Sequence, residues 1–332
     1  MPQPSDSLES ASPTPIAVVV GVLTFKRPEG LAKLLQSLRV QVCDPERPYT
    51  LTVVVVDNDP GASGRQALTD FENDPAFPLI YVIETEPGIP FGRNRAMDES
   101  PASTDVFCFV DDDEWVVPDW LDALLAIRAR TGAGCVYGPV EPVYPEDADD
   151  YFIKTGVFER RTYADGVEID HAASNNVMFD LPAFRALGLR FEERMRHTGG
   201  TDYLFFERAV RAGVHIHWAD RALVYDVVPS HRMTWKWILM RQYRLGNTLA
   251  SFDVYHAGLG ARARRVLYGG ARIALGIVML PVLAISARRG MTALSHIFRG
   301  SGMVTAILGH HYQEYDQKPV ASAHVRAEAS AT

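Results

Sequence analysis

Short runs of apolar residues alternate with amphipathic or polar segments through the first 140 residues of the chain. Such runs are typical of strands that are buried on both faces, as in parallel sheets covered by helices. The alternation therefore predicts an α/β fold with a mostly parallel, doubly wound sheet and helices on both faces. The expected strands are Ile16–Val22, Leu51–Val56, Leu79–Ile83, Val106–Val110 and Cys135–Val140, and the expected helices begin near Pro28, Gln66, Pro90 and Pro118.

The pattern changes after Pro142, where an acidic loop and short irregular apolar runs predict a mixed extension of the same sheet. From Trp235 onward the periodicity is helical. The expected organisation is a disordered tail at 1–14, an α/β domain at 15–234 with halves 15–140 and 141–234, a helical segment at 235–313 and a flexible tail at 314–332.

The chain carries a formal net charge of −8, which argues against a nucleic-acid partner. The charge is unevenly distributed. Between Val227 and Gln313 there are eleven Lys and Arg residues and one acid, Asp253, so this segment is +10 and the remainder is −18. An acidic body joined to a basic, apolar segment predicts that one end of the molecule faces an anionic surface.

Residues 266–287 are apolar except for Arg272. Their uncharged part, Ile273–Ala287, has 15 residues, fewer than the ~20 of a membrane-spanning helix, and Pro281 interrupts it. A buried helix pair is one interpretation. We favour a peripheral or monotopic helix in a membrane interface, because basic residues that can contact lipid phosphates flank both ends. These flanking residues are Arg262, Arg264, Arg265, Arg288 and Arg289.

Several common protein classes lack support in the sequence. The loop after the first strand contains neither G-x-G-x-x-G nor G-x-x-x-x-G-K-[ST], which argues against hydride transfer and P-loop hydrolysis. Two of the three cysteines lie in apolar runs, as expected for core residues in a reducing compartment. The polar N-terminal residues do not have the pattern of a secretory signal peptide.

Polar side chains follow four of the expected strands, at the edge where open parallel sheets bind ligands. Three consecutive carboxylates, Asp111 to Asp113, are the strongest signal, because their mutual repulsion is relieved by a bound cation. Mg²⁺ and Mn²⁺ prefer such oxygen ligands and share substrate phosphates. A solvated acidic turn is the plain alternative.

A further acid, Asp202, follows Gly199-Gly200 and precedes an amphipathic segment. Glycine lets the backbone approach a ligand closely, so Asp202 is a candidate general base. Capping of a helix by Thr201 or Asp202 is the structural alternative. Arg232 and Arg244 are candidates for contact with a diphosphate, or else face solvent or a membrane.

In order and spacing, these segments resemble the family-2, inverting, GT-A-fold glycosyltransferases, and more narrowly their bacterial exopolysaccharide (succinoglycan-type) branch. The resemblance extends over about residues 24 to 247. Its motifs are T-F-K-R-P (24–28), V-V-V-V-D-N-D (53–59), E-P-G-I-P-F-G-R-N-R-A (86–96), F-V-D-D-D-E-W (109–115), Y-G-P-V-E-P (137–142), T-G-G-T-D (198–202) and R-Q-Y-R-L-G-N (241–247).

The resemblance implies a Rossmann-like GT-A sheet and roles for individual residues. Asp111 and Asp113 would hold the diphosphate of a nucleotide sugar through Mg²⁺ or Mn²⁺, and Asp202 would be the catalytic base. The implied contacts of the nucleotide sugar are Thr24, Arg27, Asp57, Arg93, Asp111 and Asp112, with Thr24 and Asp57 against the base and ribose. Asn176, Arg232 and Arg244 are further candidates for diphosphate or acceptor contact.

The chain departs from the family pattern in three places. Thr201 stands where the family usually has Glu, and Ser174-Asn175-Asn176 replaces the usual Thr-Gly-Asn of the acceptor loop. Residues 242–245 do not match the Q-x-x-R-W motif of processive synthases, so transfer of a single sugar is expected.

The resemblance thus implies an inverting, metal-dependent hexosyltransferase of cell-surface polysaccharide synthesis. Its donor would be a nucleoside diphosphate sugar and its acceptor a saccharide, in particular a lipid-linked one, at the cytoplasmic face of a bacterial cell membrane. Two alternatives stay open. A nucleotidyltransferase that makes sugar nucleotides would release pyrophosphate from a nucleoside triphosphate. A non-catalytic partner of a membrane assembly would bind the sugar nucleotide without transferring the sugar.

Overall fold

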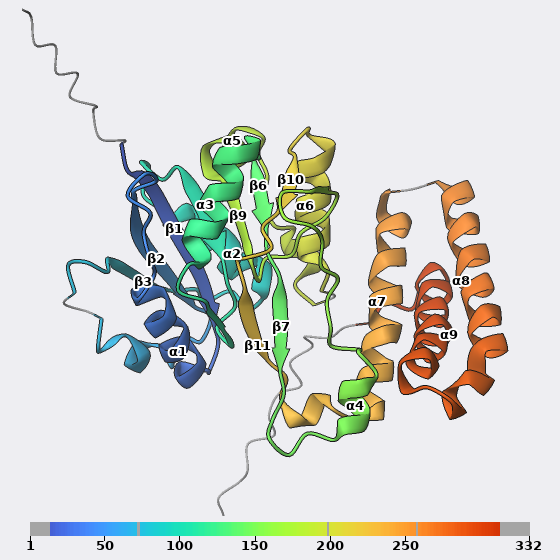
Figure 1. Cartoon of the computed structure of the whole chain (residues 1–332). Helices are drawn as coiled ribbons and strands as arrows, with labels where there is room; N and C mark the ends of the chain where they lie inside the picture. The colour runs from blue at the N-terminus through green and yellow to red at the C-terminus, as the bar shows by residue number, and fades with distance from the viewer. Residues whose placement is uncertain (1–13, 72–73, 198, 257, 313–332) are drawn as a thin grey trace, which may run out of the picture.

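The computed structural model describes residues 14–71, 74–197, 199–256 and 258–312, with only the backbone for 252–256. The expected terminal tails, apart from residue 14, lie outside the described residues, and so does Thr198 of the predicted T-G-G-T-D motif. The described part forms an α/β domain with three long helices beside it (Figure 1).

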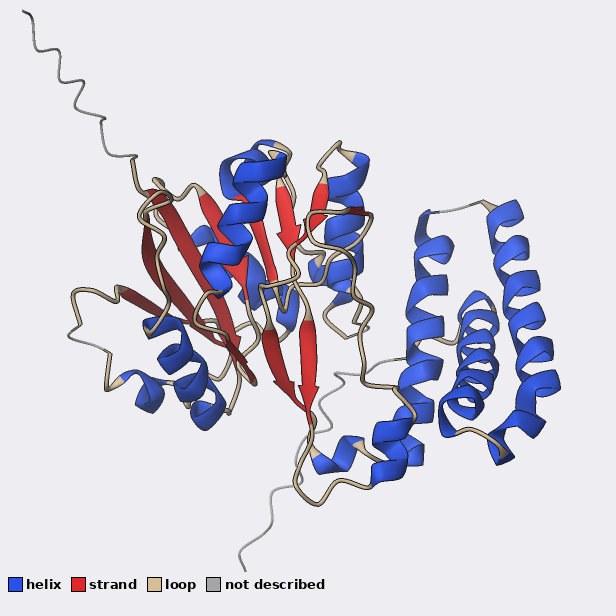
Figure 2. Cartoon of the chain, viewed as in Figure 1, coloured by secondary structure: helices blue, strands red, loops and turns tan. Residues whose placement is uncertain are grey.

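The α/β domain is built around a sheet with strand order β3-β2-β1-β4-β9-β6-β10-β8 (Figure 2). Strands β3, β2, β1 and β4 are parallel to one another, which confirms the predicted fold class and the first four strands. In sheet order the strands are β3 (Leu79–Ile83), β2 (Tyr49–Asp57), β1 (Ile16–Thr24), β4 (Val106–Phe109), β9 (Val177–Asp180), β6 (Cys135–Tyr137), β10 (Ile216–Trp218) and β8 (Glu168–Ile169).

The half of the sheet beyond β4 is mixed, as the sequence predicts for residues 141–234. One of its strands, β9, lies near the centre of the sheet, where it runs antiparallel to both β4 and β6. An apolar run predicts a buried strand, but its neighbours in the sheet are set by the tertiary fold.

A second, three-stranded sheet has the order β5-β11-β7, formed by β5 (Glu114–Val116), β11 (Val224–Val227) and β7 (Val140–Val143). The prediction of one strand over Cys135–Val140 is therefore wrong, because the segment is divided between two sheets at Gly138-Pro139. Proline lacks the N–H that a continuing strand would pair. The small sheet connects the end of the aspartate run with the half of the domain at 141–234.

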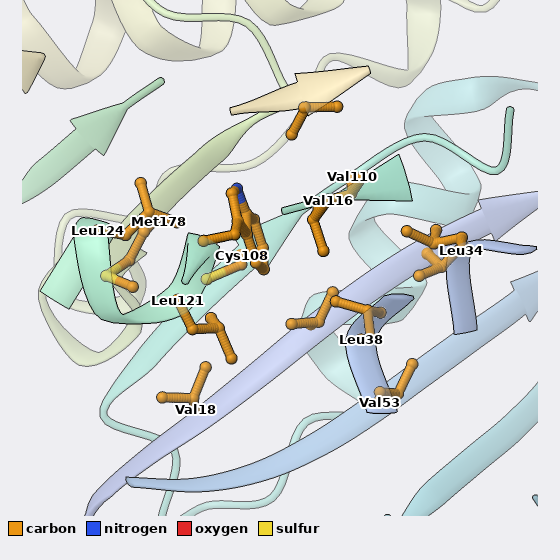
Figure 3. Close-up of a cluster of buried hydrophobic side chains, with 14 of the residues drawn as sticks. Val18, Leu34, Leu38, Val53, Cys108, Val110, Val116, Leu121, Leu124 and Met178 are labelled. Carbon is orange, nitrogen blue, oxygen red and sulfur yellow. The ribbon is translucent and has the colours of Figure 1, made fainter. Parts of the chain in front are cut away.

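Helices cover both faces of the large sheet, as predicted. On one face Leu34 and Leu38 of α1 and Leu121 of α3 lie against Val18 and Val53 of the sheet (Figure 3). Each such fully buried side chain contributes about 1.5–3 kcal/mol of hydrophobic stabilisation. The other face is covered by apolar residues of α2, α5 and α6. The helices of this domain are α1 (Pro28–Arg39), α2 (Ile89–Asp98), α3 (Trp120–Thr131), α4 (Asp150–Lys154), α5 (Leu181–Ala186) and α6 (Thr201–Arg211), with 3₁₀ turns η1 (Arg65–Leu68), η2 (Glu193–Met195) and η3 (Ser230–Arg232).

The segment from Trp235 forms a bundle of α7 (Trp235–His256), α8 (Leu259–Met279) with the 3₁₀ turn η4 (Leu280–Ala284), and α9 (Ala287–Ile307). Helix α9 packs against both α7 and α8 (Figure 1). The bundle joins the α/β domain through a small apolar cluster that includes Phe158, Ile238 and Met291. Within the described residues, one stretch, Leu259–Ala284, is long and apolar enough to cross a membrane, and little of it is buried.

Candidate active site

The loops after β1 and β4 are joined by hydrogen bonds at the carboxyl edge of the parallel strands. Thr24 Oγ1 donates to Asp112 Oδ2 over 2.8 Å. Arg27 Nη1 donates to Asp112 Oδ1 over 3.0 Å and to Asp113 Oδ2 over 2.9 Å. The structure therefore brings these four predicted residues together.

The three consecutive aspartates differ in exposure, and they form a turn between β4 and β5 instead of prolonging a strand. The side chain of Asp112 is 6% exposed, whereas those of Asp113 and Asp111 are 24% and 42% exposed. Asp112 thus serves as the anchor for Thr24 and Arg27. The first and third carboxylates remain accessible to a cation.

Arg93, on α2, joins two of the predicted acids. Its Nη1 donates to Asp202 Oδ1, and its Nη2 lies 3.5 Å from Asp111 Oδ1. The guanidinium is largely buried and lies 5.4 Å from the centroid of the Phe191 ring. A buried charge requires paired partners, so Arg93 holds the candidate base beside the candidate metal carboxylate.

Asp202 lies in the first turn of α6, and Gly200 is the residue before that helix. Both Gly199 and Gly200 have left-handed backbone conformations, with φ of +70° and +81°, which favour glycine. No side chain caps this helix start, so Asp202 is not used as a cap. Its carboxylate interacts favourably with the N–H groups of the first helical turn.

Asp57, at the end of β2, is fully buried. It accepts hydrogen bonds from Gly64 N (2.7 Å), Tyr81 Oη (2.8 Å) and Asp59 N (3.0 Å). Thr24 is also buried. The two residues predicted to lie against the base and ribose thus fix the loops of this edge through bonds within the protein.

Exposed residues of the same two loops line a cavity of about 600 Å³. Lys26 and Ala62, which both line it, have φ of +56° and +54°. Non-glycine residues in this conformation are strained, and such strain clusters at ligand sites. The cavity offers the cationic groups of Lys26 and Arg65 at the edge of the parallel strands.

Glu114 was not singled out from the sequence, although it directly follows the aspartate run. It is buried, and it accepts hydrogen bonds from Asp111 N (3.0 Å) and Asn175 Nδ2 (2.7 Å). The neighbouring Asn176, a predicted diphosphate or acceptor contact, is fully buried. Its amide binds Trp120 Nε1 and the carbonyl oxygens of Pro139 and Ala222. The structure therefore uses Asn176 within the framework and does not bring it to the accessible site.

A second charged cluster lies where the small sheet meets α7. Arg160 Nη2 binds Asp226 Oδ2 over 3.1 Å, and Asp226 stands opposite Glu114 across the β5–β11 pair. Burial, moderated by the charge of Arg160, raises the pKa of Asp226. Neither Arg160 nor Asp226 belongs to a recognisable motif, so no sequence pattern predicts a role for them.

Arg232 and Arg244 belong to this second cluster. Burial, together with repulsion by Arg160, Arg244 and Arg232, lowers the pKa of Arg241 to about 10. Asp226 raises the pKa of Arg241 by less than burial and the three arginines lower it. The arrangement is therefore suited to bind an anion such as a phosphate or diphosphate.

The aspartate run is electrostatically strained without a cation. Loss of hydration raises the pKa of Asp111 to about 7, and the negative charges of Asp113 and Asp202 add to this rise. The positive charge of Arg93 opposes it. Burial raises the pKa of Asp112 and of Glu114 as well. A nearby divalent cation would favour the ionised forms.

The donor set fits a cation that is held jointly with a substrate. Among the residues that the structure describes, no three His, Cys, Asp or Glu side chains converge into a preformed metal cage. Asp111 and Asp113 offer accessible carboxylate oxygens, the ligand type that Mg²⁺ and Mn²⁺ prefer. Two carboxylates suffice when substrate phosphates and water supply the other ligands.

Residues 19–190 match the family described as glycosyl transferase family 2. Succinoglycan biosynthesis protein ExoM of Rhizobium meliloti (strain 1021) is 31% identical over 311 residues, which are 92% of this chain and 97% of ExoM.

Solved structures share the fold at low sequence identity. S. aureus TarS 1–349 in complex with UDP-GlcNAc matches with a TM-score of 0.52 and 16% identity, over 90% of this chain and 93% of that one. The match to a longer S. aureus TarS chain covers 55% of that chain, with a TM-score of 0.50. GalNAc-T7 with UDP, GalNAc and Mn²⁺ matches with a TM-score of 0.51 and 11% identity, over 64% of this chain and 44% of that one.

Proposed function

The chain belongs to glycosyl transferase family 2, and on that basis we propose that it moves one sugar from a nucleoside diphosphate sugar to a saccharide acceptor, with inversion at the anomeric carbon. The observation that carries the proposal is the contact of Arg93 with both Asp111 and Asp202. This contact places a candidate base next to a candidate diphosphate site, as a single displacement requires.

Asp111 and Asp113 would hold Mg²⁺ or Mn²⁺ together with the donor diphosphate. When bound, the cation stabilises the negative charge that develops on the departing diphosphate. Arg27 keeps Asp113 in place, and Asp112 ties the same loop to Thr24. The matching TarS complex contains UDP-GlcNAc and the matching GalNAc-T7 complex contains UDP and Mn²⁺, which supports a donor and cation of these classes.

Asp202 accepts the proton of the acceptor hydroxyl as the hydroxyl oxygen attacks C1 of the donor sugar from the face opposite the diphosphate. Arg93 orients this carboxylate. Thr201, which replaces the usual Glu, contributes its hydroxyl 3.4 Å from Asp202 Oδ1. The base function therefore rests on Asp202, with Thr201 as a neutral neighbour.

Arg232 in η3, together with Arg241 and Arg244 in the first half of α7, receives the diphosphate as it leaves. Arg232 and Arg244 lie close enough to Arg241 to lower its pKa, so an incoming anion relieves their mutual repulsion. Asp226 interacts with Asp113 as well as with Arg232, which connects this cluster to the aspartate run.

The acceptor is a saccharide on a lipid carrier at the cytoplasmic face of the cell membrane. The relation to a protein named for succinoglycan biosynthesis supports a polysaccharide product. Helix α8 supports the membrane location, since Leu267 and Val278 are 74% and 76% exposed on it.

The proposal is tested by incubating the purified protein with UDP-, GDP- or dTDP-sugars and bacterial lipid-linked saccharides, with and without Mn²⁺. We expect acceptor-dependent release of a nucleoside diphosphate and a product whose anomeric configuration, read by NMR, is opposite to that of the donor. Pyrophosphate release from a nucleoside triphosphate would instead identify a nucleotidyltransferase. Donor binding without hydrolysis or transfer would identify a binding partner.

Metal affinity and stability should respond to pH in opposite directions. Since the pKa of Asp111 is raised from 3.8 to about 7, the folded state holds a proton between these values that the unfolded state has lost. The metal-free protein should therefore gain stability as pH falls from 8 to 6, whereas Mn²⁺ affinity should fall. Thermal melts and calorimetry at both pH values measure the two trends. In Asp111→Asn we expect a smaller pH dependence of the melting temperature, and an unchanged dependence would contradict this account.

Gly30→Ala should displace the aspartate run, although Gly30 itself lies in α1. A methyl group at Gly30 would lie 2.4 Å from the carbonyl oxygen of Asp112, so α1 or the loop must shift. Alanine normally stabilises a helix interior by about 1 kcal/mol relative to glycine. Here we expect a loss of about 1–3 kcal/mol of stability, together with weaker donor binding. The control is Gly270→Ala in α8, because a Cβ atom at Gly270 would have no neighbouring atom within 4 Å. Gly132→Ala is unsuitable because Gly132 has a left-handed φ.

A further inference from the structure

Three basic side chains lie between helices of the bundle, away from the proposed active site. They are Arg272 on α8 and His296 and Arg299 on α9. Burial and the charges of both arginines lower the pKa of His296, and burial and Arg272 lower the pKa of Arg299. The three groups are therefore close enough to repel one another.

Close packing of the two helices holds these groups together. A Cβ atom on Gly300 of α9 would lie 2.5 Å from the carbonyl oxygen of Gly269 on α8. A Cβ atom on Gly276 would lie 2.6 Å from the carbonyl oxygen of Ala293. Only glycine permits this approach of the two backbones. Moving α8 and α9 apart to reduce the repulsion among the three basic groups would therefore break this close packing.

The cluster lacks a described counter-charge. Arg299 Nε donates to the neutral Gln242 Oε1 over 2.6 Å, and Arg272 Nη1 contacts Tyr268 Oη at 3.4 Å. Arg272 Nε and His296 Nδ1 are buried and have no hydrogen-bond partner among the described residues. Asp253, the sole acid between Val227 and Gln313, is eleven residues beyond Gln242, about 16 Å along α7.

We propose that Arg272, His296 and Arg299 bind the phosphate group of a membrane lipid. A phosphate supplies the acceptors and the negative charge that the cluster lacks. The apolar surface of α8 beside it, with Leu275 47% and Ile277 55% exposed, suits acyl chains. The site is distinct from the proposed diphosphate site, and it rests on the membrane association proposed above.

Flotation of the full chain with vesicles tests this site. Vesicles of phosphatidylcholine are compared with vesicles that contain phosphatidylglycerol, at 0.15 M and 0.5 M NaCl. The wild type should prefer the anionic vesicles at both salt concentrations, because a partly buried phosphate contact is screened less than a surface charge. Arg272→Gln should weaken binding to the anionic vesicles about tenfold or more, and keep that defect at high salt.

Arg264→Gln is the matched control, because Arg264 is an exposed arginine of the same helix and the charge change is identical. We expect a smaller loss of binding that disappears at 0.5 M NaCl. Equal defects in both variants, or no preference of the wild type for anionic vesicles, would overturn the lipid site while leaving membrane association intact.

Absence of flotation with every vesicle would overturn the membrane association as well. The glycosyltransferase proposal is tested separately, by measuring donor binding.

A second readout separates a binding site from a structural role. Without lipid, removal of one mutually repelling charge in Arg272→Gln should maintain or raise the melting temperature of the protein. A clear decrease in melting temperature would indicate that Arg272 stabilises the bundle, and would overturn the proposal. Arg299→Gln provides an independent variant, with the same expected loss of binding to anionic vesicles.

Discussion

Asp202→Asn should lower the turnover number for sugar transfer by about 10³-fold or more, while the dissociation constant of the donor stays within about threefold of the wild type. Asparagine keeps the size of the side chain and can still accept a hydrogen bond from Arg93. It cannot accept the proton of the acceptor hydroxyl. Single-turnover transfer measures the chemical step, and calorimetry with a donor and Mn²⁺ measures binding.

Asp122→Asn is a suitable control for this variant. Asp122 is the acid in the first turn of α3 and pairs with Arg47 at 3.1 Å, so its replacement also removes a carboxylate from the first turn of a helix and from an arginine partner. We expect near-normal turnover in the control. Wild-type turnover in Asp202→Asn would exclude Asp202 as the base. An equal loss in both variants would point to helix stability instead of proton transfer.

The parallel half of the sheet was predictable from the sequence because its strands are covered on both faces. Val18 to Val20 and Val53 to Val56 are buried, so the strands are apolar at every position. The mixed half was less predictable. Strand β9 is equally apolar, but nothing in its composition places it between β4 and β6.

The candidate site was predictable where a residue belongs to a motif at a strand end. Asp111, Asp113, Arg93 and Asp202 come from three separate segments, and the contacts of Arg93 link Asp111 to Asp202. Asp113 is held by Arg27. Arg160 belongs to no motif and acts through its ion pair with Asp226. Arg241 lies in the R-Q-Y-R-L-G-N motif, but its proximity to Arg160 and Asp226 is tertiary and has no signal in the sequence.

Sequence position alone does not distinguish residues that contact a ligand from residues that hold the loops in place, because the two kinds differ in burial. Asn176 and Asp57 lie in predicted motifs, yet both side chains are fully buried and hydrogen-bonded to neighbouring loops. A motif identifies a position near a ligand, but whether that side chain is accessible depends on the surrounding loops.

The double replacement Asp111→Asn/Asp113→Asn should weaken Mn²⁺-dependent donor binding by about 100-fold or more, and make the remaining affinity insensitive to EDTA. The two amides preserve shape but remove the charges that a divalent cation requires. Loss of the Asp111 charge also relieves a strained group, so the metal-free variant should be at least as stable as the wild type. Calorimetry with and without EDTA, together with thermal melts, measures these effects.

Two further variants separate cation binding from simple damage to the loop. Asp112→Asn leaves both accessible carboxylates in place but disturbs the bonds to Thr24 and Arg27, so we expect a lower melting temperature with donor binding that still depends on Mn²⁺. Asp170→Asn, at a side chain that is 94% exposed, should change neither. If the double variant bound the donor as tightly as the wild type, with or without EDTA, the carboxylates would not be holding a cation. The turn would then be an acidic connection between β4 and β5, and the proposed diphosphate site would have to depend on the arginines of η3 and α7.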